Sequence, residues 1–365
     1  MSGKITSQHE WVDKIEGMLP STIGLNLRRK ADVKYVETVG GKPIFSDADA
    51  YNFGNSTLHD EILYRAVPAL EAKAGKDCVA NLLGELTFRK TYGAFSEMAA
   101  YDWMGRTGID YTPQVERTAA EVVNRNGSTI DGKFPGATQE IFFDIKGFGF
   151  VEHKIELLKK RLEEDAPGDE VIVEGIIAAS IDDIQSLLER PGYDALKNEL
   201  AQAGTARRGT LVFTRRPRPR VSMSMSEPDP VTLAVQNREY ALRYGSQFQR
   251  IAPFMLFFVV HPWFSRGSLH QNFAGFTDTF CQEFARQTFD TFNSDQTLRE
   301  GMPTADLVKL LSSIAFINVW PEAASKGGGP QSRIYLNPHA THKLDAAEFA
   351  GPKARLGADL LIRQL

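Results

Sequence analysis

The sequence has little cysteine and no long apolar run. Its two cysteines, Cys78 and Cys281, form no C-x-x-C pair, which excludes disulfide scaffolds and cysteine-rich zinc modules and favours a reducing cytoplasm. The longest purely apolar run, Phe254–Val260, is far short of the ~20 residues that a membrane-spanning helix needs. No G-x-x-x-x-G-K-[ST] segment occurs, so a P-loop ATPase is also excluded. We expect a soluble, cytoplasmic protein.

Charge is low overall but unevenly distributed. The net charge is −4, which by itself does not indicate a partner of nucleic acids. However, six arginines and no acid occur between Arg207 and Arg220, whereas Glu163 to Glu170 holds five acids and no base. The arginine segment is either a solvated loop that its prolines keep extended or a basic patch whose guanidinium groups bind phosphates. In the second case the nucleic-acid-binding residues are Arg215, Arg216, Arg218 and Arg220.

The hydrophobic pattern divides the chain into three regions. Residues 1–90 are expected to form a mixed, partly helical N-terminal extension. Strands alternate with helices from about 95 to 262, which predicts an α/β core over 91–265 with a mixed or mostly parallel central sheet flanked by helices. Residues 266–365 are expected to form a C-terminal helical extension that packs on this core.

Several strands of the core can be placed individually. Glu140–Phe148 alternates between apolar and mixed positions, as expected for a strand. Val171–Ala178 and Phe254–Val260 are nearly all apolar, which is typical of buried parallel strands. Asp229, between two prolines, is expected to begin a helix that continues to about Phe248.

The residues best suited to chemistry lie on the alternating strand. Asp144 and Lys146 are two residues apart, so both side chains project from the same face. A carboxylate and an ammonium group on one face can hold a divalent cation and offset charge on a phosphate. Asp131, thirteen residues upstream at the end of a neighbouring strand, could supply a second carboxylate.

The acid-x-lysine triplet alone is weak evidence, because it occurs five times in the chain. The triplet at Asp144 differs from the others in its context. It lies on an alternating strand, an acid precedes it at a turn shortly upstream, and Gly147 follows it directly.

These residues resemble the motifs of the PD-(D/E)xK nuclease superfamily. Members carry an acid on a helix before the core sheet, an aspartate at a strand end, and an acid-x-lysine on the next strand. Glu97 matches the helical acid, Asp131 the aspartate, and Asp144 with Lys146 the final pair. Ile130 stands where the family often has proline, and Asp144 stands where glutamate is commoner.

A second match lies further along the chain. Gln236 and Tyr240 are similar to the Gln-x-x-x-Tyr element of the branch that resembles RecB nuclease domains. The resemblance implies that Gln236 reaches the metal site, and that Tyr240 contacts the substrate backbone or supports the active-site lysine. Together the motifs cover about residues 97 to 262, under half of the chain.

The resemblance implies a restriction-endonuclease-like fold and a nuclease that depends on Mg²⁺, with Mn²⁺ as an alternative. Glu97, Asp131 and Asp144 would hold the metal with the Ile145 carbonyl, and Lys146 would position the attacking water or stabilise the transition state. DNA is the expected substrate, and phage defence is one setting in which this core is used. A homodimer, or a partner protein that supplies targeting or motor activity, is also implied.

Simpler interpretations remain open for each motif. Asp144 and Lys146 fit the solvated face of an ordinary strand, and Glu97 fits an exposed helical acid, with Glu85 as a rival for its role. Gln236 and Tyr240 fit a contact pair one helical turn apart. The alternative function is a non-catalytic nucleic-acid-binding or scaffold protein that retains the nuclease fold.

Two other features are more simply structural. His339 and His342 form an H-x-x-H pair, but turn residues surround them and no glutamate follows the first histidine, as a zinc protease motif requires. The aromatic residues of the segment after the last buried strand are most simply part of the core, although exposed rings can stack on bases; they are Trp263, Phe264, Phe273 and Phe276.

Overall fold

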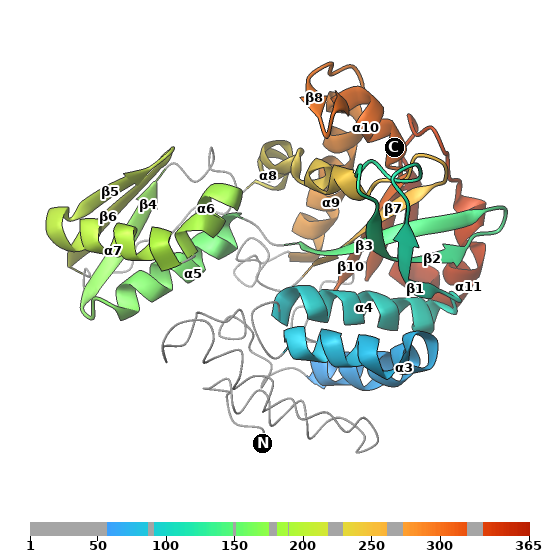
Figure 1. The fold of residues 1–365 in the computed structure, drawn as a ribbon, viewed down its shortest axis with the longest axis horizontal. Coiled ribbons are helices and arrows are strands. Elements are labelled where there is room, and N and C mark those ends of the chain that lie inside the picture. Colours follow the sequence, from blue (N-terminus) through green and yellow to red (C-terminus); the bar gives the residue numbers. More distant parts are fainter. Residues whose placement is uncertain are drawn as a thin grey trace.

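The computed structural model describes residues 57–86, 91–148, 151–174, 181–188, 190–217, 229–260, 273–319 and 331–365. Figure 1 shows a large body built around one sheet and a smaller α/β unit set to one side of it. The large body has a mixed central sheet flanked by helices, so the predicted fold class is confirmed.

The central sheet has seven strands in the order β1-β2-β3-β7-β10-β11-β12. The first three strands form an antiparallel meander, and β3, β7 and β10 run parallel. β11 is antiparallel to β10 and parallel to β12. The strands are β1 (Thr112–Arg117), β2 (Ser128–Pro135), β3 (Glu140–Phe148), β7 (Phe254–Val260), β10 (Ser313–Asn318), β11 (Ser332–Leu336) and β12 (Leu360–Gln364).

Both faces of this sheet are covered by helices, which is why β7 is apolar at every position. The odd-numbered residues of β3 and β7 pack with α3 (Thr57–Leu86) and α4 (Thr91–Thr107) in one hydrophobic cluster. Even-numbered residues of the same strands pack with α8 (Pro230–Asn237) and α9 (Phe273–Thr291) in a second cluster. Asp144 and Lys146 therefore belong to the face that α8 and α9 cover.

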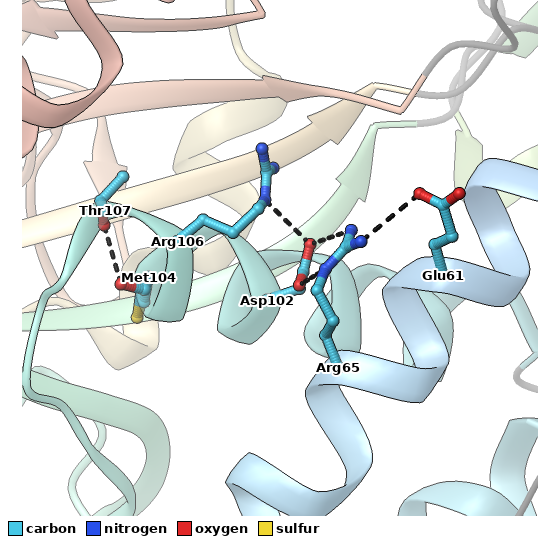
Figure 2. A network of polar contacts seen from close by, with 6 residues as sticks. All are labelled: Glu61, Arg65, Asp102, Met104, Arg106 and Thr107. Carbon is cyan, nitrogen blue, oxygen red and sulfur yellow. Dashed lines mark hydrogen bonds and ion pairs between the residues drawn. The ribbon is translucent and has the colours of Figure 1, made fainter.

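The N-terminal helices are held together by a buried carboxylate (Figure 2). Asp102 on α4 is 4% exposed and accepts hydrogen bonds from Arg65 on α3, at 2.6 and 3.1 Å, and from Arg106, at 3.1 Å. The helical part predicted before residue 90 includes α3, which consists of two helices merged across a kink. They meet at Gly75, whose φ of 81° lies outside the helical region and is available to glycine at low cost.

The smaller unit is an insertion between β3 and α8. Its antiparallel sheet has the order β4-β6-β5, and its own hydrophobic core joins this sheet to three helices. The elements are α5 (Val151–Glu164), β4 (Asp169–Glu174), α6 (Ile181–Leu188), α7 (Arg190–Ala203), β5 (Thr205–Arg208) and β6 (Leu211–Pro217).

The prediction of a buried parallel strand over 171–178 was wrong. β4 pairs antiparallel with β6 at the edge of the small sheet, and of its residues only Val171 is fully buried. An apolar run indicates burial but not the direction of the partner strand. Residues 175–180 lie outside the described part of the chain.

The sequence predicted that residues 266–365 form a helical extension outside the core, and this prediction was wrong. β10, β11 and β12 all belong to the central sheet, so residues 313–364 complete the core itself. The shorter elements of the large body are η5 (Tyr240–Gln247), β8 (Leu298–Arg299), β9 (Met302–Pro303), α10 (Thr304–Leu310), η8 (Ala346–Phe349), α11 (Ala350–Leu356) and η9 (Gly357–Asp359). Within the described ranges, no helix combines the length and apolarity needed to cross a membrane.

Candidate active site

The predicted acidic residues meet where β2 and β3 separate. The ladder between these strands runs from Pro135 opposite Glu140 to Gly132 opposite Phe143, where it ends. Asp131 is the next residue of β2 beyond this ladder. In place of a ladder bond, Asp131 Oδ2 accepts a hydrogen bond of 2.6 Å from the Ile145 amide.

Asp144 and Lys146 form a close ion pair on the same face of β3. Lys146 Nζ lies 2.6 Å from Asp144 Oδ2, the Asp144 side chain is completely buried, and that of Lys146 is 21% exposed. Neither oxygen of Asp144 receives a well-directed hydrogen bond from the described residues. The ammonium group of Lys146 therefore lies beside Asp144 where another cation would also bind.

The charges of the cluster act strongly on one another. Burial raises the pKa of Asp131 well above its usual range, and the charges of Asp144 and Glu97 raise it further, against the effect of Lys146. Burial alone would lower the pKa of Lys146, but Asp144 and Asp131 outweigh it, so this pKa is raised. Lys146 is therefore an ammonium cation at neutral pH rather than a free base.

Glu97 belongs to the same electrostatic group. It lies half-buried on α4, and its charge contributes to the raised pKa values of both Asp131 and Lys146. Glu85, its rival for this role, is absent from the charges that shift either pKa. Of the two predicted helical acids, Glu97 is the one that the fold couples to the cluster.

The donor set fits a divalent cation through two carboxylates. Asp131 and Asp144 offer hard oxygen ligands, and the ammonium group of Lys146 lies against one oxygen of Asp144. Mg²⁺ commonly binds through one or two carboxylates and keeps several waters. In the described part of the chain, however, no three His, Cys, Asp or Glu side chains are gathered closely enough to hold a metal together. The predicted ligand set of Glu97, Asp131 and Asp144 is therefore not gathered into one group in the described structure.

Tyr240 supports the strand segment that follows Lys146. Its hydroxyl donates to the Gly147 carbonyl at 3.4 Å, and its ring packs edge-on against Phe148 at 5.1 Å. Of the two roles implied for this tyrosine, the contacts favour support of the active-site lysine. Tyr244, one turn further on, donates to the Tyr240 hydroxyl at 3.1 Å, and its ring centre lies 5.2 Å from Lys146 Nζ.

Gln236 is not brought to the cluster. It is exposed on α8, and within the described residues its side chain hydrogen-bonds to none of the predicted site residues. The single helix predicted to about Phe248 is divided, because α8 ends at Asn237 and a separate 3-10 helix begins at Tyr240. The start at Asp229 is confirmed, since this residue caps α8 through the Thr232 amide.

Two residues that sequence reasoning missed hold the backbone of Asp131. The buried Tyr101 hydroxyl donates to the Asp131 carbonyl at 2.8 Å. Gln114 lies opposite Asp131 in the β1–β2 register, has a left-handed φ of 52°, and hydrogen-bonds to the Tyr101 hydroxyl. Tyr101 could have been noticed as the residue one helical turn after Glu97. Nothing in the sequence signals the backbone conformation of Gln114.

The predicted basic patch is partly neutralised by the acidic run. In the small sheet, Arg215 Nε lies 2.6 Å from Asp169, and Arg216 Nε lies 2.6 Å from Glu170. Two of the four arginines proposed to bind phosphates are thus paired with carboxylates. Arg218 and Arg220 lie outside the described residues.

The histidine pair makes separate contacts. His339 Nε2 lies 3.3 Å from Asp290, whereas His342 Nε2 lies 2.9 Å from the Arg250 carbonyl, as expected for two structural residues. Of the aromatic group, Phe276 is buried in the core. Trp263 and Phe264, and the side chain of Phe273, lie outside the described part.

Any functional conclusion must come from the geometry of Asp131, Asp144 and Lys146. Comparison of the chain with models of known protein families, with curated proteins and with solved structures finds no match.

Proposed function

We propose that the protein is a metal-dependent nuclease that hydrolyses phosphodiester bonds in DNA. The observation that carries this proposal is the meeting of Asp131 with Asp144 and Lys146 at the point where β2 and β3 separate. These residues follow the order that the resemblance to the PD-(D/E)xK superfamily implies, although Asp131 lies within β2, where its ladder with β3 ends, and not at the end of the strand as expected. The helix–meander–helix–strand succession α4, β1–β3, α8 and β7 supports the same assignment.

Each residue has a distinct role in this proposal. A bound Mg²⁺ or Mn²⁺ would supply Lewis acidity and lower the pKa of a water molecule. Asp131 and Asp144 hold the cation, and the Ile145 amide and Tyr101 keep Asp131 in place. Lys146, kept protonated by its carboxylate neighbours, stabilises the negative charge that develops on the phosphate.

Lys146 must leave Asp144 to act in this way. Its ammonium group now lies against Asp144 Oδ2, which is the position that a cation would also favour. If Asp144 held a cation, repulsion between like charges would weaken the ion pair of Lys146 with Asp144, and Lys146 could then face a phosphate oxygen. Its partial exposure provides the access that the substrate needs.

The test is cleavage of supercoiled, linear and single-stranded DNA and of an RNA, in Mg²⁺, Mn²⁺ or EDTA. Asp144→Ala and Lys146→Ala are assayed beside Lys133→Ala, a matched control whose lysine pairs with exposed Glu140 in the same sheet. We expect metal-dependent cleavage of DNA that both site variants abolish and the control retains. Cleavage by Lys146→Ala at the wild-type rate would contradict the proposal.

A second candidate is a non-catalytic nucleic-acid-binding protein that retains the fold. It is favoured by the ion pair at Asp144 and by the lack, among the described residues, of a three-ligand group ready to hold a metal. Binding of DNA without metal, together with no cleavage of any substrate, would select this candidate. Calorimetric Mg²⁺ binding that is lost in Asp144→Ala would instead indicate an enzyme that needs a partner.

The setting of the reaction is part of the same proposal. Both cysteines that the structure describes are free thiols, in keeping with a reducing cytoplasm. Cleavage of both strands would call for two copies of the site, hence a homodimer or a partner protein that brings the chain to its substrate.

A further inference from the structure

Lys146 contacts a second group besides Asp144. Its ammonium nitrogen lies 2.6 Å from Asp144 Oδ2 and 5.2 Å from the centre of the Tyr244 ring, over the ring. A cation within about 6 Å of an aromatic ring centre is attracted by the negative face of the ring. Tyr244 lies on η5, beyond the Gln-x-x-x-Tyr element, and is none of the motif residues. The ammonium group therefore has two favourable neighbours of different chemistry, a carboxylate and an aromatic face.

Neighbouring side chains hold the Tyr244 ring in place. Its hydroxyl donates to the Tyr240 hydroxyl at 3.1 Å, and the two rings meet edge-on with their centres 5.7 Å apart. Phe258, which lies beside Lys146 in the register of β3 and β7, is a third ring of this group, with its centre 6.4 Å from that of Tyr244. The aromatic face near Lys146 thus has a defined position, as a positioning residue requires.

The two neighbours differ in what they do when the site holds a metal. The inference rests on the proposed function, in which Asp131 and Asp144 hold a divalent cation and Lys146 loses its ion pair. The carboxylates whose charges act on Lys146 are Asp144, Asp131 and, most weakly, Glu97. Glu97 lies on α4, which packs on the odd-numbered residues of β3. Tyr244 packs on the even-numbered face, which carries Lys146, and it has no charge that a divalent cation would engage.

We propose that Tyr244 is a positioning residue for Lys146, and that its ring holds the ammonium group when Asp144 holds the divalent cation. The movement is small, because the ammonium group already lies within reach of the ring. The attraction persists without the ion pair, because the quadrupole of a neutral ring is its source. Lys146 is then kept at the site with its charge available to a phosphate oxygen.

Two replacements of Tyr244 separate the effect of the ring from that of the hydroxyl. Tyr244→Phe keeps the ring and loses the hydrogen bond to Tyr240, whereas Tyr244→Leu loses both. We expect Tyr244→Leu to lower kcat for DNA cleavage about fivefold with unchanged KM, the factor that corresponds to an exposed cation–π contact. Tyr244→Phe should cleave at nearly the wild-type rate. Tyr64→Leu, which removes an exposed ring from α3, is the matched control and should have no effect.

NMR of the Lys146 side chain gives a readout that needs no cleavage. In the full chain, isotope-labelled at the lysine ε-methylene groups, the Lys146 signal is the one that Lys146→Met loses. Protons over an aromatic face shift upfield, so we expect Mg²⁺ to increase this shift in the wild type and Tyr244→Phe and to cause none in Tyr244→Leu. Trifluorophenylalanine in place of Tyr244 keeps a ring of similar shape but weakens its negative face. It should lower kcat as Tyr244→Leu does, and it tests the attraction if the leucine variant folds poorly.

The outcomes separate this inference from the nuclease proposal. Equal cleavage by the wild type and Tyr244→Leu, or equal losses in Tyr244→Leu and Tyr244→Phe, would overturn the role of the ring and leave the nuclease proposal intact. A Mg²⁺-dependent upfield shift that only Tyr244→Leu loses, in a protein that cleaves no substrate, would support the role of the ring and reject the nuclease. A Lys146 signal that does not change when Mg²⁺ is added to the wild type would overturn the role of the ring.

Discussion

The carboxylate of Asp131 takes the place of a β-ladder partner for the amide of Ile145. Their hydrogen bond of 2.6 Å forms one residue beyond the last paired position of β2 and β3, Gly132 opposite Phe143. The two strands can therefore separate without leaving this amide unpaired. The same bond directs Asp131 toward Asp144, so the break in the sheet and the assembly of the acidic cluster have one cause.

Replacement of Lys146 tests how much its ion pair with Asp144 stabilises the fold. Lys146→Met leaves a fully buried carboxylate without its cation, and we expect a loss of about 3–5 kcal/mol in the free energy of unfolding. Lys133→Met breaks an exposed pair with Glu140 and should cost less than about 1 kcal/mol. Urea unfolding of both variants measures the difference. Equal losses would mean that the buried Lys146–Asp144 pair contributes no more to stability than the exposed Lys133–Glu140 pair.

Replacement of Asp131 should stabilise the metal-free protein at alkaline pH. Because its pKa in the folded protein is raised, its contribution to stability is fully present below the unfolded pKa and is lost as the pH rises through the folded value. Asp131→Asn removes this loss and keeps an oxygen for the Ile145 amide. We expect its melting temperature to exceed that of the metal-free wild type by a few degrees at pH 8, with little difference in acid.

The control variant should show the opposite dependence of stability on pH, because the pKa of its residue is lowered and not raised. Asp110 is fully exposed, and its hydrogen bond to Lys73 lowers its pKa. Asp110→Asn should therefore destabilise slightly at neutral pH and not in acid. Calorimetric scans at several pH values compare the two variants. If Asp131→Asn melts below the wild type at pH 8, ionisation of Asp131 in its buried position does not destabilise the folded protein.

The local part of the site could be predicted from the sequence. Alternation along Glu140–Phe148 is a short-range signal, and it correctly places Asp144 and Lys146 on one face of β3. The turn at Gly127, just before β2, is also local, because its positive φ of 75° is one that glycine adopts at low cost. Such features depend on a few neighbouring residues, which the sequence displays directly.

The parts that were missed depend on distant contacts. β11 and β12 are short, and β11 contains a buried arginine, Arg333, which hides the apolar pattern of a core strand. The pairing of Arg215 with Asp169 depends on the register of β4 and β6, and segments in between separate these strands. Hydrophobic periodicity does not carry this information.

Tyr101 should act as a positioning residue for Asp131. Tyr101→Phe removes the hydrogen bond to the Asp131 carbonyl, and we expect a stability loss of about 1 kcal/mol and a lower kcat with unchanged KM. Tyr111→Phe is the control, because its stacked ring is 5.1 Å away and its hydroxyl has no partner in the described structure. NMR titration of the Asp131 carboxyl provides a readout that a purely structural role would not change.

Asp102 should contribute to the fold and not to the chemistry. Its two arginine partners, Arg65 and Arg106, are 42% and 37% exposed, so water can solvate them if the carboxylate is lost. Asp102→Asn is therefore expected to cost about 1.5–3 kcal/mol, the range for hydrogen bonds to charged groups. Asp306→Asn, at an exposed pair with Lys309, should cost a small fraction of this.

Activity measurements decide whether the contact between Arg65 on α3 and Asp102 on α4 can be lost without affecting the site residues on α4. Glu97 and Tyr101 both lie on α4 beside Asp102, so a loosened helix would displace them together. Because β3 and β7 hold the other side of α4 through a large hydrophobic cluster, we expect Asp102→Asn to keep the wild-type cleavage rate well below its melting temperature. A reduced rate in a fully folded sample would show that α3 helps to position Glu97.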